Sequence, residues 1–147
     1  MGLQQQVMDQ MKMAMKAKDT VALESLRAIK SALLLAKTSG QGDLSEDDEV
    51  KLVQKLVKQR KDSATIFSNQ GRQDLADPEL AQIAVLEQFL PEQLSNEEIE
   101  KVVVQTISET EASGMKDMGK VMGMVSKELA GRADGKTISS IVKNKLG

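Results

Sequence analysis

The 147-residue sequence contains no cysteine, no histidine, no tryptophan and no tyrosine. Without cysteine the chain has no disulfide, no thiolate nucleophile and no cysteine metal ligand. Without histidine it lacks the usual general base at neutral pH and the commonest metal ligand in proteins. No nucleophile paired with a base, cluster of metal ligands or pair of catalytic acids stands out among the remaining residues. We therefore predict no catalytic residue, no metal site and no cofactor, and favour a binding module over an autonomous enzyme.

Proline is also scarce, with two residues, and apolar residues recur at spacings of three and four almost throughout. This periodicity predicts an all-α protein. Pro91 ends one apolar pattern, and Ser95 with Glu98 then forms a capping box, flanked by Leu94 and Ile99 as a hydrophobic staple. We predict two modules, which are an N-terminal module of four helices, residues 1–92, and a C-terminal module of three helices, residues 93–147.

Local signals predict several helix boundaries in the first module. Asp19 or Thr20 caps a second helix, Ser45 caps a third, and Asp77 caps a fourth whose first helical residue is Pro78. The loop before the third helix covers residues 39–45. The apolar stripes assigned to the helices of this module include Met8, Met15 and Leu80. The nine methionines suit either an adaptable binding groove or the core, and their positions on the apolar stripes favour core filling.

Long hydrophobic runs are absent as well. The longest strongly apolar run, ALLLA at residues 32–36, is too short to cross a bilayer. The N-terminal residues MGLQQQVMDQMK show no basic segment followed by an apolar one, so we expect no export signal. These features predict a soluble, cytoplasmic protein without a membrane partner.

The stretch GRADGKTISS, residues 131–140, is one residue short of the phosphate-binding pattern G-x-x-x-x-G-K-[ST]. That pattern needs a strand before the loop, whereas the residues before Gly131 read as a helix. We therefore predict a turn between two helices, of which the first covers about 116–130 and the second about 135–146. Gly131 would end the first helix in a left-handed conformation and Asp134 would cap the second.

Charge is unevenly distributed along this chain of net charge −2. Residues 95–114 hold one basic and five acidic side chains, whereas residues 115–147 hold seven basic and three acidic ones, a net charge of +4. On a helical projection, the lysines of the last two helices lie opposite the apolar residues. Lysines in such positions are either solvated surface or a site for a phosphate backbone. The candidate nucleic-acid-binding residues are Lys116, Lys120, Lys127, Arg132, Lys136 and Lys143.

Glycines accompany these lysines. Gly119 and Gly123 project beside them, although a glycine within a helix costs about 1 kcal/mol relative to alanine. One interpretation is close packing of a neighbouring helix, and the other is a smooth strip that a phosphate backbone approaches. The two turn glycines, Gly131 and Gly135, belong to the same candidate surface. Because Phe67 and Phe89 are the only aromatic residues, any recognition of RNA would be of its backbone and shape rather than of its bases.

Four motifs occur together in this order: QRKDS (59–63), LPEQLSNEEI (90–99), GKVMG (119–123) and GRADGK (131–136). With them, essentially the whole chain resembles the GatB/YqeY family, in particular its small free-standing YqeY-like members. In the large relatives, the B subunits of tRNA-dependent amidotransferases, a similar helical tail engages tRNA. The resemblance implies an all-helical, two-part, cytosolic and bacterial protein. The residues that match the helix-turn-helix surface of that tail are Gly119, Lys120, Gly123, Gly131, Arg132, Gly135 and Lys136.

Nothing in the chain matches the catalytic cradle of those large relatives, so the resemblance carries over no catalytic residue. The first hypothesis is therefore a non-catalytic accessory module that binds tRNA or a tRNA-processing protein complex. The alternative is a protein–protein interaction module whose glycine strip accepts a helix, with no nucleic-acid role. A third is an assisting role in a complex with a glutamine-dependent amidotransferase, a carbon–nitrogen ligase.

Overall fold

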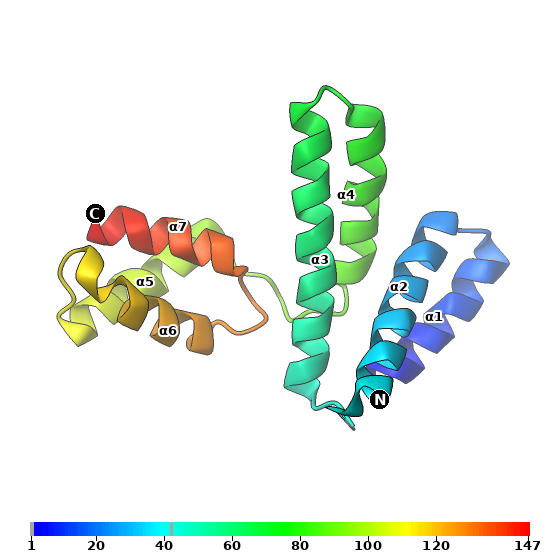
Figure 1. Ribbon diagram of the computed structural model, residues 1–147, viewed down its shortest axis with the longest axis horizontal. Coiled ribbons are helices and arrows are strands. Elements are labelled where there is room, and N and C mark those ends of the chain that lie inside the picture. Colours follow the sequence, from blue (N-terminus) through cyan, green and yellow to red (C-terminus); the bar gives the residue numbers. More distant parts are fainter. Residues whose placement is uncertain (1, 42) are drawn as a thin grey trace. The chain divides into compact units, whose positions relative to one another are not determined.

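The computed structural model describes residues 2–41 and 43–147, so Gly42 of the expected loop lies outside the described residues. Within these ranges the regular structure is helical, with no strand, which confirms the all-α prediction (Figure 1). The described residues form seven α-helices, a short π-helical turn, η1, and a short 3-10 turn, η2. Their bounds are α1 Leu3–Ala17, α2 Thr20–Ala36, η1 Lys37–Gln41, α3 Glu46–Asn69, α4 Gln73–Glu87, α5 Asn96–Thr110, η2 Met115–Asp117, α6 Met118–Glu128 and α7 Gly135–Leu146.

Contacts within the chain define two compact units, Met1–Leu90 and Pro91–Gly147, here called unit 1 and unit 2. Unit 1 contains α1 to α4, and unit 2 contains α5 to α7. Each unit has its own hydrophobic core.

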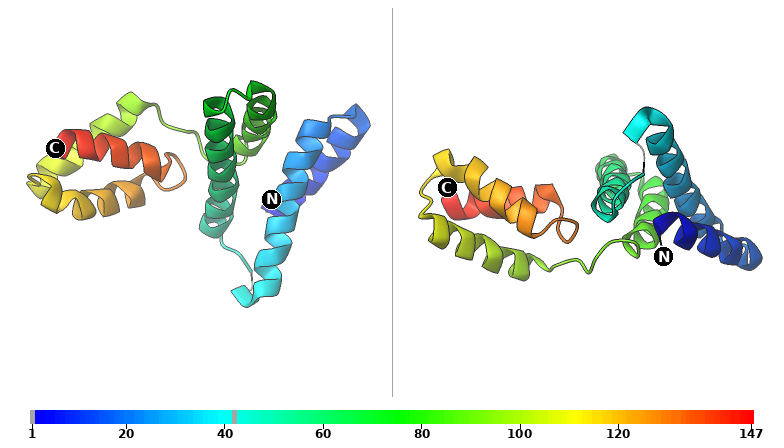
Figure 2. Two further views of the ribbon diagram at one scale, coloured as in Figure 1. Left: turned by 45° about the horizontal axis from the view of Figure 1, so that its top comes forward. Right: turned by 90° about the horizontal axis from the view of Figure 1, so that it is seen from below.

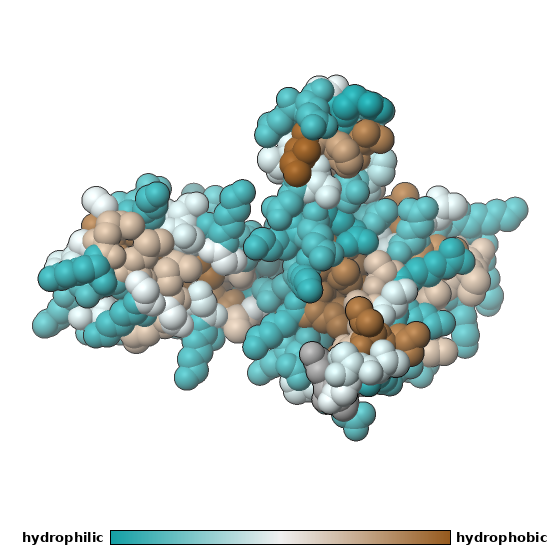
Figure 3. Space-filling model, viewed as in Figure 1, coloured by the Kyte–Doolittle hydropathy of each residue, from teal (hydrophilic) through white to brown (hydrophobic). Residues whose placement is uncertain are grey.

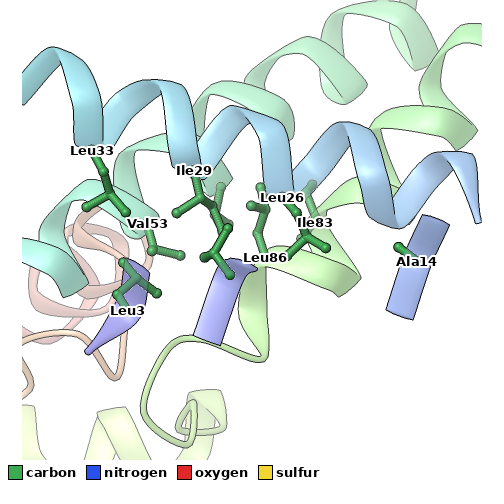
Figure 4. Packing of buried hydrophobic residues seen from close by; sticks show 10 residues of the cluster. Leu3, Ala14, Leu26, Ile29, Leu33, Val53, Ile83 and Leu86 are labelled. Atoms are coloured by element: carbon green, nitrogen blue, oxygen red, sulfur yellow. The ribbon is translucent and has the colours of Figure 1, made fainter. Parts of the chain in front are cut away.

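Two helical hairpins form unit 1, and Figures 1 and 2 show α1 beside α2 and α3 beside α4. The first hairpin turns sharply because Lys18 adopts a left-handed conformation, with φ of 56°, and Asp19 caps α2 by accepting a hydrogen bond from the Ala22 amide at 3.0 Å. Side chains of all four helices meet in the core (Figure 4). The buried hydrophobic residues of this core are Leu3, Val7, Ala14, Leu26, Ile29, Leu33, Val53, Val57, Ile83 and Leu86. Complete burial of each large aliphatic side chain contributes about 1.5–3 kcal/mol.

Polar side chains also connect the helices of unit 1. The backbone amide of Leu3, one of the unpaired donors at the start of α1, donates to a carboxylate oxygen of Glu49 on α3 at 3.1 Å. Arg60, part of the QRKDS motif, donates from Nε to Gln82 on α4 at 2.8 Å, and Gln82 donates to Glu24 on α2 at 3.2 Å. Arg60 of this motif therefore contributes to the fold of unit 1.

The predicted start of α4 is wrong. The helix begins at Gln73, so Pro78 lies inside it and Asp77 is not its cap; the Asp77 carboxylate instead accepts a hydrogen bond from the Gln73 side chain at 2.6 Å. Gly71, with φ of 72°, reverses the chain directly after α3, and Ala76 is then fully buried in the first turns of α4. The burial of these turns outweighs the hydrogen bond that Pro78 removes.

The prediction that the methionines fill the core is also wrong for most of them. The buried hydrophobic positions of α1 are Leu3, Val7 and Ala14, and no methionine of the described chain is fully buried. Met11, Met118 and Met122 are partly buried against the two cores. Those exposed to solvent are Met8, Met13, Met15, Met115 and Met124. Leu80, also expected on an apolar stripe, is exposed as well, because the buried face of α4 is formed by Ala76, Ile83 and Leu86.

Unit 2 consists of α5, α6 and α7 around a core of its own. Its start carries the expected capping box, since the Ser95 hydroxyl accepts from the Glu98 amide at 3.2 Å and the Glu98 carboxylate accepts from the Ser95 amide at 3.2 Å. Leu94 packs against the same core as Ile99, as the hydrophobic staple requires. The buried hydrophobic residues of this core are Ile99, Val103, Val121, Val125, Leu129, Ala133, Ile138, Val142 and Leu146.

Candidate nucleic-acid interface

The turn between α6 and α7 joins the two basic helices of unit 2 and sets their relative orientation. Gly131 has φ of 81°, the left-handed conformation expected of it, and Asp134 caps α7 by accepting from the Thr137 amide at 2.8 Å. The Arg132 carbonyl accepts from the Leu94 amide at 2.9 Å, which ties the turn to the segment before α5. The element before the turn is a helix, so the strand that a phosphate-binding loop requires is not there.

All six candidate basic side chains are exposed to solvent. Lys120 and Lys127 lie on α6, and Lys136 and Lys143 lie on α7. Lys116, which was expected on the same helix as Lys120, lies instead in the 3-10 turn η2 that precedes α6. The helix begins only at Met118, later than the expected residue 116, because residues 115–117 form this tighter turn first.

Arg132 differs from the candidate lysines because its side chain interacts with neighbouring groups of unit 2. Its Nε donates to the backbone carbonyl of Glu92 at 3.4 Å. The pKa of Glu98 is lowered mainly by the hydrogen bond from the Ser95 amide, then by the Ser95 hydroxyl, and further by the positive charges of Arg132 and Lys101. Part of the Arg132 charge therefore acts on a carboxylate of the same unit, which the sequence alone did not indicate.

Other charged residues of unit 2 have structural partners. Asp117 accepts a hydrogen bond from the Ser113 amide at 2.8 Å, and Asp134 is occupied as the cap of α7. The ammonium group of Lys145 pairs with Glu100 of α5 at 2.7 Å. This solvent-exposed ion pair joins α7 to α5, so the charge of Lys145 is partly offset by Glu100.

The glycines of α6 do not support helix packing within the chain. A Cβ atom built at Gly119 or at Gly123 would have no neighbour within 4 Å, and both residues are exposed. Gly135, the first residue of α7, is equally open. Gly131 is buried and is required by its positive φ. The strip formed by Gly119 and Gly123 is therefore a free surface in this chain, and its role in a close approach to a partner stays a prediction.

Charge of opposite sign lies on α5 of the same unit. The helix holds four glutamates and one lysine, of which Glu97, Glu100, Glu109 and Lys101 line a shallow hollow together with Val104, which is 47% exposed; Glu100 is paired with Lys145. Unit 2 therefore presents an acidic helix in addition to its two basic ones. A phosphate backbone is attracted to the lysines of α6 and α7 and is repelled by α5.

Metal-binding and membrane-spanning features are both absent from the residues that the structure describes. No group of three or more Asp and Glu side chains is arranged there to hold a metal ion. None of the helices in these ranges combines the length and apolar character needed to span a membrane.

Fold and surface together define an all-helical protein of two compact units, the second of which exposes basic residues on two of its helices. Comparison with known families makes this class specific, because the sequence profile described as Yqey-like protein matches residues 4–146. The chain belongs to the YqeY-like family, as the four motifs indicated.

Individual relatives extend this result. The chain is 30% identical to altered inheritance of mitochondria protein 41, mitochondrial, of Pyrenophora tritici-repentis over 140 residues, which are 93% of this chain and 77% of that protein. A protein of the same name from Kluyveromyces lactis is 30% identical over 90% of this chain and 70% of its own length. The chain is also 34% identical to the E subunit of glutamyl-tRNA(Gln) amidotransferase from Thermococcus gammatolerans over 104 residues, 68% of this chain but 17% of that relative.

These relatives bear on two expectations. Similarity to a component of an amidotransferase supports the resemblance on which the function hypothesis rests. The two fungal relatives are named as mitochondrial proteins, so the comparisons do not support the expectation of a bacterial, cytosolic protein.

Proposed function

We propose that this protein is a non-catalytic accessory module that binds tRNA, or a tRNA-processing protein complex, through the basic surface of α6 and α7. It would act in association with a glutamine-dependent tRNA amidotransferase. In this proposal units 1 and 2 are the two helical modules, of four and three helices, and unit 2 corresponds to the helical tail of the amidotransferase B subunits.

The observation that carries the proposal is the set of six exposed basic residues in the last 33 residues of a chain with a net charge of −2. Two of the three acidic residues in that segment, Asp117 and Asp134, accept hydrogen bonds from backbone amides. The similarity to part of a tRNA amidotransferase supplies the class of nucleic acid. Each phosphate contact made by a lysine releases counterions, so binding would depend steeply on salt.

The test is binding of purified protein to bulk tRNA between about 50 and 200 mM salt, a range in which six to ten phosphate contacts weaken affinity by about 10³-fold or more. The variant Lys116→Glu/Lys120→Glu/Lys127→Glu should lose binding over this whole range of salt concentration. A matched control is Lys51→Glu/Lys55→Glu/Lys58→Glu, which reverses three exposed lysines of α3 in unit 1. Unchanged tRNA affinity in the first variant, or an equal loss in both, would reject this surface.

The open glycine strip favours a second candidate, a protein–protein interaction without nucleic acid. Exposed glycines four residues apart allow a partner helix to approach the backbone of α6 closely, and Met124 beside them is exposed as well. Gly119→Leu should then abolish association with an amidotransferase complex while leaving tRNA affinity unchanged. Loss of tRNA affinity in this variant would instead assign the strip to the nucleic-acid surface.

A further inference from the structure

A groove in unit 1, far along the chain from the basic helices, has an apolar floor and a basic rim. Its apolar lining comes from Val7 and Met8 of α1 and from Leu33 and Leu34 of α2. The polar lining residues are Gln4, Lys30 and Lys37. The cavity volume is about 110 Å³. Since an apolar cavity of about 150 Å³ binds benzene, this groove has room for one aliphatic side chain.

The apolar side chains of the groove are open to solvent. Leu34 is 62% exposed and Met8 is 39% exposed, although both lie on helices whose opposite sides form the core. Figure 3 shows hydrophobic surface over the part of α2 that leads to η1. Neither side chain is needed to fill the core, because Val7 and Leu33 already do so beside them. The fold therefore does not account for these two exposed apolar residues.

The charge around the groove is positive. Lys30 lies on α2 four residues before Leu34, and Lys37, the residue that directly follows α2 and begins η1, lies three residues after Leu34; these spacings bring both lysines to the side of the helix that carries Leu34. Lys37 donates to the neutral amide oxygen of Gln4 at 2.9 Å, a bond that fixes the ammonium group at the rim without neutralising it. Residues 3–41 hold six basic and three acidic side chains, a net charge of +3. A ligand of this groove needs an apolar ridge flanked by acidic groups.

We propose that the groove between α1 and α2 binds an amphipathic helix of a partner protein, with the apolar ridge on its floor and acidic residues against Lys30 and Lys37. Helices pack by setting the ridge of one into the groove of another, and a groove between two antiparallel helices offers that geometry. The side chain of Met8 is unbranched and adapts to the shape of the incoming ridge. A concave floor with polar sides fits a helix better than a flat lipid surface.

The experiment uses the full chain and two labelled synthetic helices of about 18 residues, or five turns. Both carry the same leucine ridge, one flanked by glutamates and the other by lysines, and binding is followed by fluorescence anisotropy. We expect the acidic helix to bind and the basic helix to bind at least about tenfold more weakly, because charge complementarity selects the partner. The double variant Lys30→Glu/Lys37→Glu should reverse this preference.

Leu34→Asp tests the apolar floor and should weaken binding of the acidic helix by about tenfold or more, since it removes the burial of one leucine. Leu35→Asp is the matched control: Leu35 is 70% exposed, neighbours Leu34 in the chain and does not line the groove, so affinity should be unchanged. Circular dichroism should show both variants folded, because both side chains are exposed.

Three results would overturn the proposal. One is the absence of binding of the acidic helix at about 1 mM, a concentration that detects interactions of about −4 kcal/mol. Another is an equal loss of affinity in Leu34→Asp and Leu35→Asp. The third is binding of the full chain to vesicles of phosphatidylserine and phosphatidylcholine, lost in Leu34→Asp, without binding of either peptide, which would make the surface a lipid-binding one.

Discussion

Gly123→Ala should stabilise unit 2, although it alters a residue of the candidate interface. Gly123 lies in the middle of α6, is exposed, and has space for a methyl group, since, apart from the adjacent residues and the local helix backbone, no atom lies within 4 Å of an added Cβ. Alanine in such a position gains about 0.8–1 kcal/mol over glycine from helix propensity. For a domain of about 60 residues, 1 kcal/mol corresponds to a rise of about 4–8 °C in the unfolding midpoint. Gly119→Ala should gain less, because Gly119 lies in the first turn of the helix.

The assay is amide hydrogen exchange of Val121 and Val125 by NMR, which reports α6 separately from unit 1 and requires no aromatic probe. A gain of 1 kcal/mol should slow exchange through global opening of unit 2 about fivefold. Gly131→Ala is the control in the opposite direction: with φ of 81°, the turn should be strained and unit 2 destabilised by about 1 kcal/mol or more. The reasoning fails if Gly123→Ala destabilises α6, since the glycine would then be needed for folding rather than for a partner.

Three other predictions concern helix starts. Ser95→Ala removes the cap of α5 and should destabilise unit 2 by about 1 kcal/mol in urea unfolding followed by circular dichroism. Because the pKa of Glu98 is lowered in the folded state, the ionised carboxylate stabilises unit 2 above the ordinary pKa of about 4.3, and this stabilisation is lost as pH falls through the folded-state pKa. Glu98→Gln should therefore reduce the loss of unit 2 stability between pH 5 and pH 3. Glu49→Gln should destabilise unit 1 by about 1 kcal/mol at neutral pH, because the hydrogen bond from the Leu3 amide loses its charged acceptor; an unchanged urea midpoint would contradict this role.

Capping and turn chemistry were readable from the sequence because they act over a few residues. Ser45, Ser95 and Asp134 cap their helices as predicted, and Gly131 adopts the expected left-handed conformation. Each depends on a hydrogen bond or a backbone conformation within about four residues of the signal. The family resemblance was equally accessible, because each of the four motifs is a short continuous stretch of the sequence.

The predictions that were wrong concern features that depend on contacts between residues far apart in the sequence. The Asp77–Pro78 pair is a good local start signal, yet burial of Ala76 extends α4 back to Gln73. The periodicity of α1 could not say which of its apolar residues face the core, so Met8 and Met15 were assigned there although they are exposed. Hydrophobic burial depends on what the other helices cover, and a sequence pattern does not contain that information.

The sequence by itself determined the all-helical class, the helix caps at Ser45, Ser95 and Asp134, the turn at Gly131 and the concentration of positive charge in residues 115–147, since these follow from composition and local chemistry. Only the tertiary structure decided which residues are available to partners. In that structure Gly119 and Gly123 are exposed, Lys145 forms an ion pair with Glu100, and Leu34 is exposed where it lines the groove between α1 and α2. Whether a residue can reach a partner depends on its exposure to solvent, and exposure is set only when helices that are distant in the sequence pack against one another.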